Sequence, residues 1–167
     1  MTTLFEKSEV DKTVEGIFGG MHMHNASASA QSIPTGAAYT AVTAYTDTDA
    51  TNMGNGVAYD NTTKELVFTE PGYFVIIGGV SFTGTGVNKE WFLAAFLDGV
   101  ERDDIHFQRK ISTGGDIGSA PLAGIITITS TTPVRLSIRA RHNDGGALDL
   151  TVTYSNIIAF KIGTYQA

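Results

Sequence analysis

The sequence predicts an all-β fold, an antiparallel jelly-roll sandwich, preceded by a short N-terminal arm or helix. After Gly20, segments rich in β-forming residues recur about 8–12 residues apart, as in sandwiches and jelly rolls. Turn residues separate these segments, and no helical period of apolar residues occurs among them. With 167 residues and 42% hydrophobic content, the chain is long enough to build one domain around its own core.

The first eighteen residues differ in composition from the rest of the chain. They are rich in charges of both signs, whereas no Lys or Arg occurs between Lys12 and Lys64. Val10, Val14 and Ile17 recur at helical spacing, and two glycines follow as a helix stop. Because so short a helix needs a surface to dock on, residues 1–18 are predicted to be an attachment arm, with a frayed terminus as the alternative. Residues 19–167 form the predicted jelly-roll domain.

The strands of this domain follow from the runs of β-forming residues between turns. Asn55-Gly56, Pro71-Gly72 and Asp98-Gly99 are among the turn signals. The predicted strands are residues 21–24, 38–45, 64–69, 72–82, 91–97, 100–111, 121–129, 134–142, 147–154 and 156–163.

Two of these strands are apolar on both faces. In residues 134–142 apolar and polar side chains alternate, which is typical of a strand with one wet face. Residues 73–77 and 91–97 show no such alternation. Since only one face of each sheet in a two-layer sandwich meets the core, the second face of these strands needs another cover. A neighbouring subunit is the simplest one, so we expect a homo-oligomer.

Part of the chain resembles a known jelly-roll family. Residues 55–82 (NGVAYDNTTKELVFTEPGYFVIIGGVSF) are similar to the N-terminal half of the jelly roll in complement-type globular heads and their tumour necrosis factor relatives. The matching features are Tyr59-Asp60, Leu66, Phe68 and Pro71-Gly72-Tyr73. Residues 93–99 and 154–162 resemble a mid-domain strand and the last strand of that fold.

A second resemblance concerns the start of the domain. Residues 20–25, with 31–42 (QSIPTGAAYTAV), look like an opening common in bacteriophage structural proteins of this jelly-roll type. The resemblance implies a homotrimer whose protomers pack around a threefold axis through aromatic-rich strands. The expected trimer interface then includes Tyr73, Val75, Trp91, Phe92, Phe96 and Phe160.

The sequence argues against an enzyme and against a bound metal or cofactor. It has no cysteine, and Ser81, in Gly79-Val80-Ser81-Phe82-Thr83, lacks the second glycine of a nucleophile elbow. His22 and His24 share one face of a predicted strand, but no third ligand has suitable spacing for zinc. A net charge of −6 argues against nucleic acid, and no apolar run is long enough to span a membrane.

Arg135, Arg139 and Arg141 form a basic stripe on the wet face of one predicted strand. The stripe either meets an acidic partner, such as a capsid surface or a glycan acid, or pairs with acidic residues nearby. The second interpretation is favoured, because Asp149 lies across the Asn143-Asp144-Gly145-Gly146 turn if that turn closes a hairpin.

The leading functional hypothesis is a non-enzymatic virion structural protein. Specifically, we expect a trimeric capsid decoration (cement) protein, made in the host cytoplasm and located on the capsid surface. Its arm would bind the major capsid protein or another shell protein, and three arms acting together would turn weak contacts into tight binding. The arm residues expected to make this contact are Leu4, Phe5, Val10, Val14 and Ile17.

Two other hypotheses place function elsewhere. A trimeric receptor-binding tip or head fibre would recognise a host-surface glycan or protein through loops far from the arm. The candidate loops are residues 83–90, 98–104, 112–119 and 142–147. A cellular complement-like ligand-binding domain is the third hypothesis, and the absence of cysteines and of a signal-peptide pattern counts against it.

Overall fold

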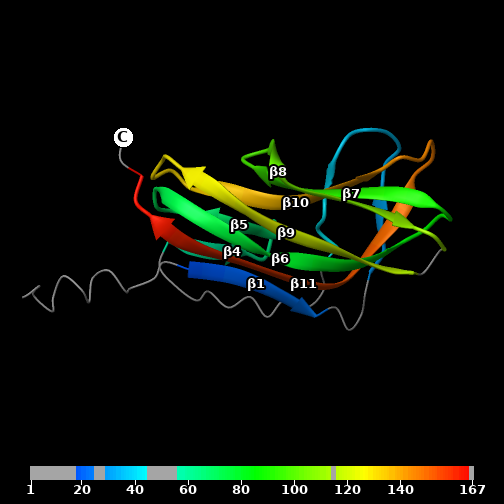
Figure 1. The fold of residues 1–167 in the computed structure, drawn as a ribbon, viewed down its shortest axis with the longest axis horizontal. Helices are drawn as coiled ribbons and strands as arrows, with labels where there is room; N and C mark the ends of the chain where they lie inside the picture. The colour runs from blue at the N-terminus through cyan, green and yellow to red at the C-terminus, as the bar shows by residue number, and fades with distance from the viewer. Residues whose placement is uncertain (1–17, 25–28, 45–55, 114–115, 166–167) are drawn as a thin grey trace, which may run out of the picture.

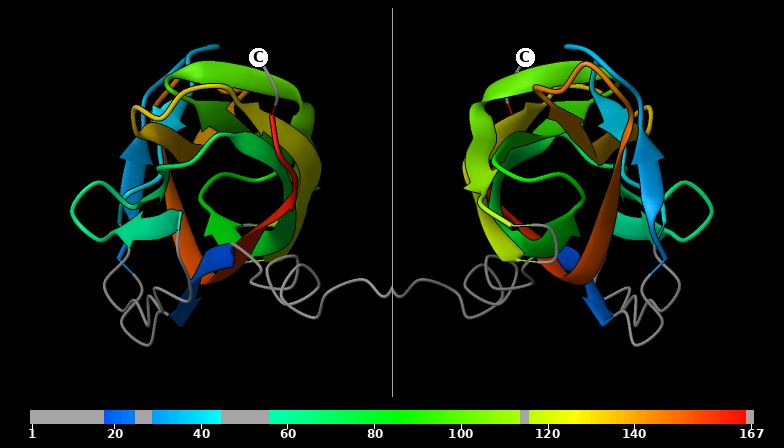
Figure 2. Two further views of the ribbon diagram at one scale, coloured as in Figure 1. Left: turned by 90° about the vertical axis from the view of Figure 1, so that its left-hand side faces the viewer. Right: turned by 90° about the vertical axis from the view of Figure 1, so that its right-hand side faces the viewer.

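The computed structural model describes residues 18–24, 29–44, 56–113 and 116–165, with only the backbone described for the first of these ranges. These residues fold into two antiparallel sheets that pack face to face, and they contain no helix. Figure 1 looks onto the outer face of the sheet that contains β6, with the other sheet behind it, and Figure 2 shows the two layers closing around the core when viewed from either end. The predicted all-β antiparallel sandwich is therefore confirmed.

The first sheet, called here the β6 sheet, has the order β1-β11-β6-β9, and β2 also pairs with β11. Its strands are β1 (Phe18–His24), β2 (Gln31–Ile33), β6 (Gly72–Gly84), β9 (Ile117–Ile128) and β11 (Leu148–Gly163). The second sheet, the β10 sheet, has the order β4-β5-β10-β7-β8, and β3 also pairs with β10. Its strands are β3 (Thr40–Ala41), β4 (Val57–Asp60), β5 (Glu65–Phe68), β7 (Lys89–Leu97), β8 (Val100–Ile111) and β10 (Val134–His142).

The core lies between the sheets and is built by strict alternation along the strands. In β6, Phe74, Ile76 and Val80 are fully buried between residues that point outward. The other sheet contributes Trp91 and Leu93 to the same cluster. Each strand thus buries one of its two faces in the core, as the packing of two sheets requires.

The turn between β7 and β8 forms as its sequence predicts. Asp98 and Gly99 both have positive φ angles, 47° and 82°, which is the backbone of a tight two-residue hairpin turn. Leu97 pairs with Val100 directly across this turn.

Several strand boundaries differ from the prediction. The two strands predicted for residues 147–154 and 156–163 are one continuous strand, β11, because a register shift between Val152 and Tyr154 absorbs one extra residue without ending the strand. Conversely, the predicted strand 38–45 is reduced to β3 (Thr40–Ala41), and β9 begins at Ile117 rather than at residue 121.

The N-terminal arm falls mostly outside the described residues. β1 begins at Phe18, the last residue of the predicted arm, and pairs with β11 so that Phe18 lies opposite Phe160. The helix expected before Gly19 and all five predicted arm contacts (Leu4, Phe5, Val10, Val14 and Ile17) lie in residues 1–17, outside the described ranges.

Candidate functional site

The outer face of the β6 sheet is apolar. In β6 itself, Tyr73 and Ile77 are 39% and 49% exposed, although both alternate with fully buried core residues. On β9, Ile125 lies opposite Val75 and is 52% exposed. On β11, Phe160 lies opposite Val75 from the other side. We call this surface the apolar face; it comprises Tyr73, Val75, Ile77, Pro121, Ala123, Ile125, Ile158, Phe160 and Ile162.

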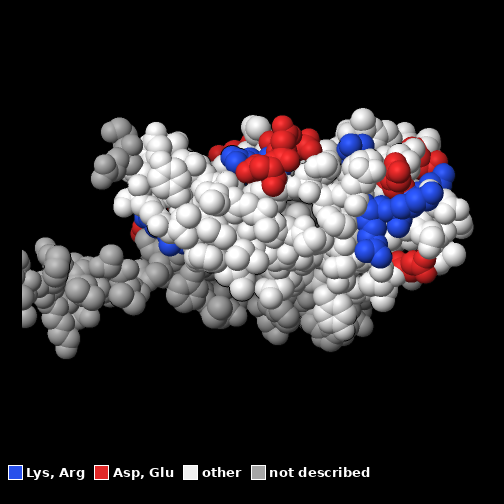
Figure 3. Space-filling model, viewed as in Figure 1, with Lys and Arg blue, Asp and Glu red and all other residues white. Residues whose placement is uncertain are grey.

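Charged side chains are missing from the centre of this face. The outward positions between residues 73 and 83 of β6, 117 and 127 of β9, and 154 and 162 of β11 hold no Asp, Glu, Lys or Arg. Figure 3 shows the same broad uncharged area in the view of Figure 1, with charges along its upper and right-hand margins and a small group at its left-hand end. An exposed apolar surface of this kind is typical of a protein–protein contact.

Three of the six predicted interface residues come together on the apolar face. Tyr73 and Val75 are on β6, and Phe160 is the cross-strand neighbour of Val75 on β11. Tyr73 also packs edge-on against Tyr165, with ring centres 6.2 Å apart. The expectation that residues 73–77 expose a second apolar face thus agrees with the structure of the protomer.

The other three predicted interface residues lie in the β10 sheet, away from the apolar face. Trp91 is 0% exposed in the core, where its ring packs against Phe82 and His142. Phe96 points outward but is only 7% exposed, because Tyr39 packs against it with ring centres 5.1 Å apart. Trp91 and Phe96 are therefore buried within one chain, which corrects their assignment to a subunit interface.

Phe92 differs from these two residues, because it is partly exposed on the outer face of β7. The guanidinium group of Arg141 lies over its ring, 3.8 Å from the ring centre. The outer face of residues 91–97 thus packs against the chain's own Tyr39, Arg139 and Arg141, and the place of Phe92 at a subunit interface stays a prediction.

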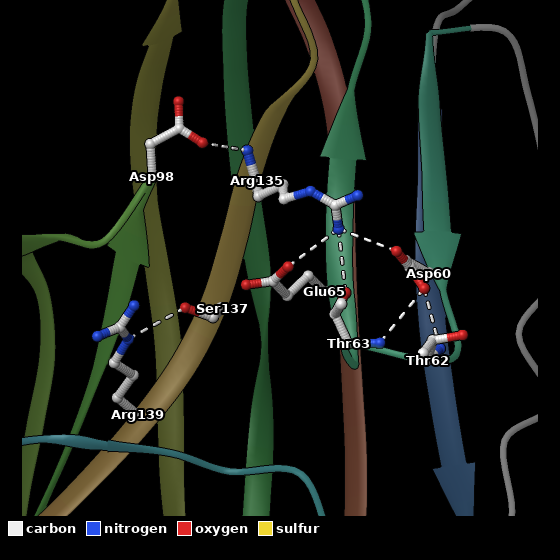
Figure 4. A network of polar contacts seen from close by, with 8 residues as sticks. All are labelled: Asp60, Thr62, Thr63, Glu65, Asp98, Arg135, Ser137 and Arg139. Atoms are coloured by element: carbon white, nitrogen blue, oxygen red, sulfur yellow. Dashed lines mark hydrogen bonds and ion pairs between the residues drawn. The ribbon is translucent and has the colours of Figure 1, made fainter.

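The arginines of the basic stripe on β10 have different partners in the fold. Figure 4 shows that Nη1 of Arg135 donates to Asp60 Oδ2 at 2.9 Å and to Glu65 Oε2 at 3.0 Å. The bond from Arg135, with the backbone N–H groups of Thr62 and Thr63 that donate to Asp60, lowers the pKa of the Asp60 carboxyl to about 2. Arg139 instead donates its Nε to Ser137 Oγ at 3.3 Å.

Asp149 does not pair with the arginines of this stripe. The sequence predicted pairing with nearby acidic residues, and the residue that it named for this role is wrong. The turn after β10 leads into the other sheet, so β10 and β11 do not form a hairpin. Asp149 pairs with Ser32 of β2, and its backbone N–H donates to Thr85 Oγ1 at 2.8 Å.

The histidines are dispersed. His22 and His24 lie on β1 opposite Asn156 and Tyr154, while His106 is exposed on β8. His142 is buried; its Nε2 donates to the Ile33 carbonyl at 3.0 Å, and its Nδ1 accepts the Asp144 N–H at 3.1 Å. In the part of the chain that is described, no three His, Asp or Glu side chains lie close enough together to bind a metal ion.

No helix among the described residues has the length and hydropathy to cross a membrane.

Of the comparisons with known proteins, only the one with solved structures finds a protein similar to this chain. No family model and no curated protein matches the sequence. Among solved structures, the chain is similar to the Eiger TNF from S. frugiperda, with a TM-score of 0.52 and 13% identity over 90% of this chain and 96% of that chain. The similarity extends over nearly the whole of both chains and agrees with the two-sheet topology described above. The chain therefore has a tumour necrosis factor-like jelly-roll fold.

Proposed function

We propose that the chain is a non-enzymatic virion structural protein, a homotrimeric capsid decoration protein that binds the shell through its N-terminal arm. The observation that carries the self-association is the apolar face. An uncharged surface across three neighbouring strands, with Ile77 and Ile125 about half exposed, is best stabilised by a copy of itself. The resemblance of residues 20–25 and 31–42 to bacteriophage structural proteins supports the virion role.

The geometry of the termini supports attachment through the arm. Phe18 lies opposite Phe160, near the end of β11, so the residues before Phe18 connect to that end of the sandwich. In a cyclic trimer all protomers point in the same direction along the symmetry axis. Three arms would then leave the trimer at one end and contact a single supporting surface together, so that weak contacts add up.

Light scattering on the full chain tests the trimer. We expect a mass of about 53 kDa, three times the 17.7 kDa chain. Ile77→Asp places a charge at the centre of the apolar face and should yield monomers. The matched control is Val100→Asp, because Val100 is 67% exposed at the start of β8 in the other sheet. A monodisperse monomer for the unaltered chain would overturn the proposal.

Removal of residues 1–17 tests the arm. The truncated chain keeps β1 and should remain a trimer, but it should no longer co-sediment with empty shells of the major capsid protein encoded alongside it. Full binding by the truncated trimer would show that the arm is not the attachment element. If shells bind neither form, the decoration role fails while the trimer stands.

A further inference from the structure

Two arginines on the outer face of the β10 sheet form no ion pair with any residue that the structure describes. Arg139 and Arg141 point outward, because Ile138, Ala140 and His142 of the same strand face the core. Both are only partly exposed. Within the described residues neither forms an ion pair, whereas Arg135 on the same strand binds two carboxylates. A half-buried cation without a counter-charge is unusual in a chain whose net charge is −6.

Aromatic rings hold both guanidinium groups in place. Arg141 lies 3.8 Å from the centre of the Phe92 ring and 5.1 Å from that of Tyr39. Arg139 lies 4.5 Å from the centre of the Phe96 ring. Stacking on a ring fixes the plane of a guanidinium group but leaves the N–H donors at its edge available. The Tyr39 hydroxyl hydrogen-bonds with Arg141 and with the carboxylate of Glu101.

The neighbouring strand β8 adds two exposed polar side chains to the same face. Arg141 lies opposite Phe92, which lies opposite Gln108, so these three residues form one row across the sheet. A second row runs from Arg139 through Ala94 to His106. Side chains in such rows share a face, and the rows are about 7 Å apart along the strands. Ala94, which lies between Arg139 and His106 in this row, is fully buried beneath the side chains of the outer face.

From this arrangement we infer that the outer face of the β10 sheet is a binding site for the carboxylate of an acidic saccharide. We call it the arginine site; it comprises Arg139, Arg141, His106 and Gln108. The fork of N–H donors on a guanidinium matches the two oxygens of a carboxylate, and such charge-assisted pairs are the strong hydrogen bonds of proteins. Gln108 and His106 supply further hydrogen-bonding groups for the hydroxyls of a sugar.

A saccharide fits this surface better than a protein partner does. Protein interfaces have an apolar centre with aromatic anchors. Here the rings of Phe92 and Phe96 are already covered by the arginines. Of the large hydrophobic side chains exposed in the described ranges, only Val100 belongs to the β10 sheet, at the start of β8. The site therefore offers polar donors over a small area, which suits a small anionic ligand.

The arginine site does not depend on the proposed trimer. It lies on the outer face of one sheet, and the apolar face lies on the outer face of the other. Since these two faces belong to different sheets, burial of the apolar face does not by itself bury the arginine site. Binding can be measured on the trimer and on the Ile77→Asp variant alike, so failure of one proposal is distinguishable from failure of the other.

Isothermal titration with sialyllactose and with a glucuronate oligosaccharide tests the inference, with lactose as the neutral probe. We expect at least one acidic saccharide to bind and lactose not to bind. Replacing both arginines (Arg139→Ala with Arg141→Ala) should weaken binding by about tenfold or more, since each charge-assisted hydrogen bond contributes about 1.5–3 kcal/mol. The control is Arg109→Ala, which removes a cation from an exposed position of β8 that lies opposite the core residue Trp91 rather than in the outer rows, and it should leave binding unchanged.

Because the arginines also cover aromatic rings, their removal could lower stability. His106→Ala and Gln108→Ala avoid this problem, since both side chains are exposed; each should weaken saccharide binding without changing the thermal midpoint. The inference is overturned if neither acidic saccharide binds at millimolar concentration, or if the Arg109→Ala control weakens binding as much as the arginine variant. It is also overturned if an oligoglutamate peptide binds more tightly than both saccharides with the same dependence on Arg139 and Arg141, which would indicate a protein partner.

Discussion

The guanidinium carbon of Arg141 lies 3.8 Å from the centre of the Phe92 ring, across the pairing of β10 with β7. The two residues are direct cross-strand neighbours on the outer face of their sheet. The contact covers an aromatic side chain that would otherwise be exposed, and it fixes the plane of a cation that has no carboxylate partner among the described residues.

A double-mutant cycle should detect this contact. We expect Arg141→Ala and Phe92→Ala each to lower the free energy of unfolding, and the coupling between them to be about 0.5–2 kcal/mol, the range of a cation–π pair that is partly shielded from water. Urea unfolding of the four proteins measures the coupling. Strictly additive effects would show that the stacking contributes nothing beyond the area that each side chain covers.

The Asp60–Arg135 pair should make stability depend on pH. The pKa of Asp60 is lowered from 3.8 to about 2 in the folded chain, chiefly by the bond from Arg135. Ionised Asp60 therefore stabilises the fold above about pH 4, and this contribution is lost as the pH falls through 2. Asp60→Asn should lower the thermal midpoint at pH 7, and the difference from the unaltered chain should shrink between pH 4 and pH 2.

The control for this pH series is Asp103→Asn, an exposed carboxylate on β8. The thermal midpoint of Asp103→Asn should follow that of the unaltered chain over the whole pH range. A constant gap between Asp60→Asn and the unaltered chain down to pH 2 would contradict the assignment.

Gly84 should not tolerate a side chain. A Cβ atom at this position would overlap the indole ring of Trp91, which is fully buried and cannot move aside. We expect Gly84→Ala to lower the free energy of unfolding by about 1–3 kcal/mol, the usual cost of overpacking a core. Gly145→Ala is the matched control, because nothing lies within 4 Å of its Cβ position. Equal unfolding midpoints in urea for both variants would refute this explanation.

The buried imidazole of His142 connects two segments that are distant in sequence. It donates to the Ile33 carbonyl and accepts from the Asp144 N–H. His142→Leu would leave both backbone groups without this partner, so we expect a loss of about 2–4 kcal/mol in chemical unfolding. His106→Leu, at an exposed position, should have little effect; a similarly small effect at His142 would mean that water replaces the imidazole.

The sequence was sufficient to predict the fold class and the apolar face, because both depend on patterns within single strands. Phe74 and Ile76 alternate with Tyr73, Val75 and Ile77, and none of these outer residues is charged. The same reasoning failed for Trp91 and Phe96. An apolar second face indicates that other residues must cover it, but it does not indicate which residues do so. Here Phe96 is covered by Tyr39, which is distant in sequence.

The partners of Arg135 were missed for a related reason. The turn after His142 has the composition of a hairpin turn, so Asp149 was the natural candidate. In the fold this turn changes sheets, and the carboxylates that bind Arg135 are 75 and 70 residues away. Pairing within a sheet is a local property only where consecutive strands are neighbours, and in a jelly roll many are not.

The pairing of Phe18 with Phe160 also has a practical consequence for display of the protein. The chain enters β1 and leaves β11 at the same end of the sandwich, while the turn that follows His142 lies at the opposite end (Figure 1). A sensor surface or carrier particle coupled at either terminus would therefore hold the molecule in the same orientation. In both cases the end bearing His142 and Arg141 would face the solution, so binding to immobilised protein should not depend on which terminus is coupled.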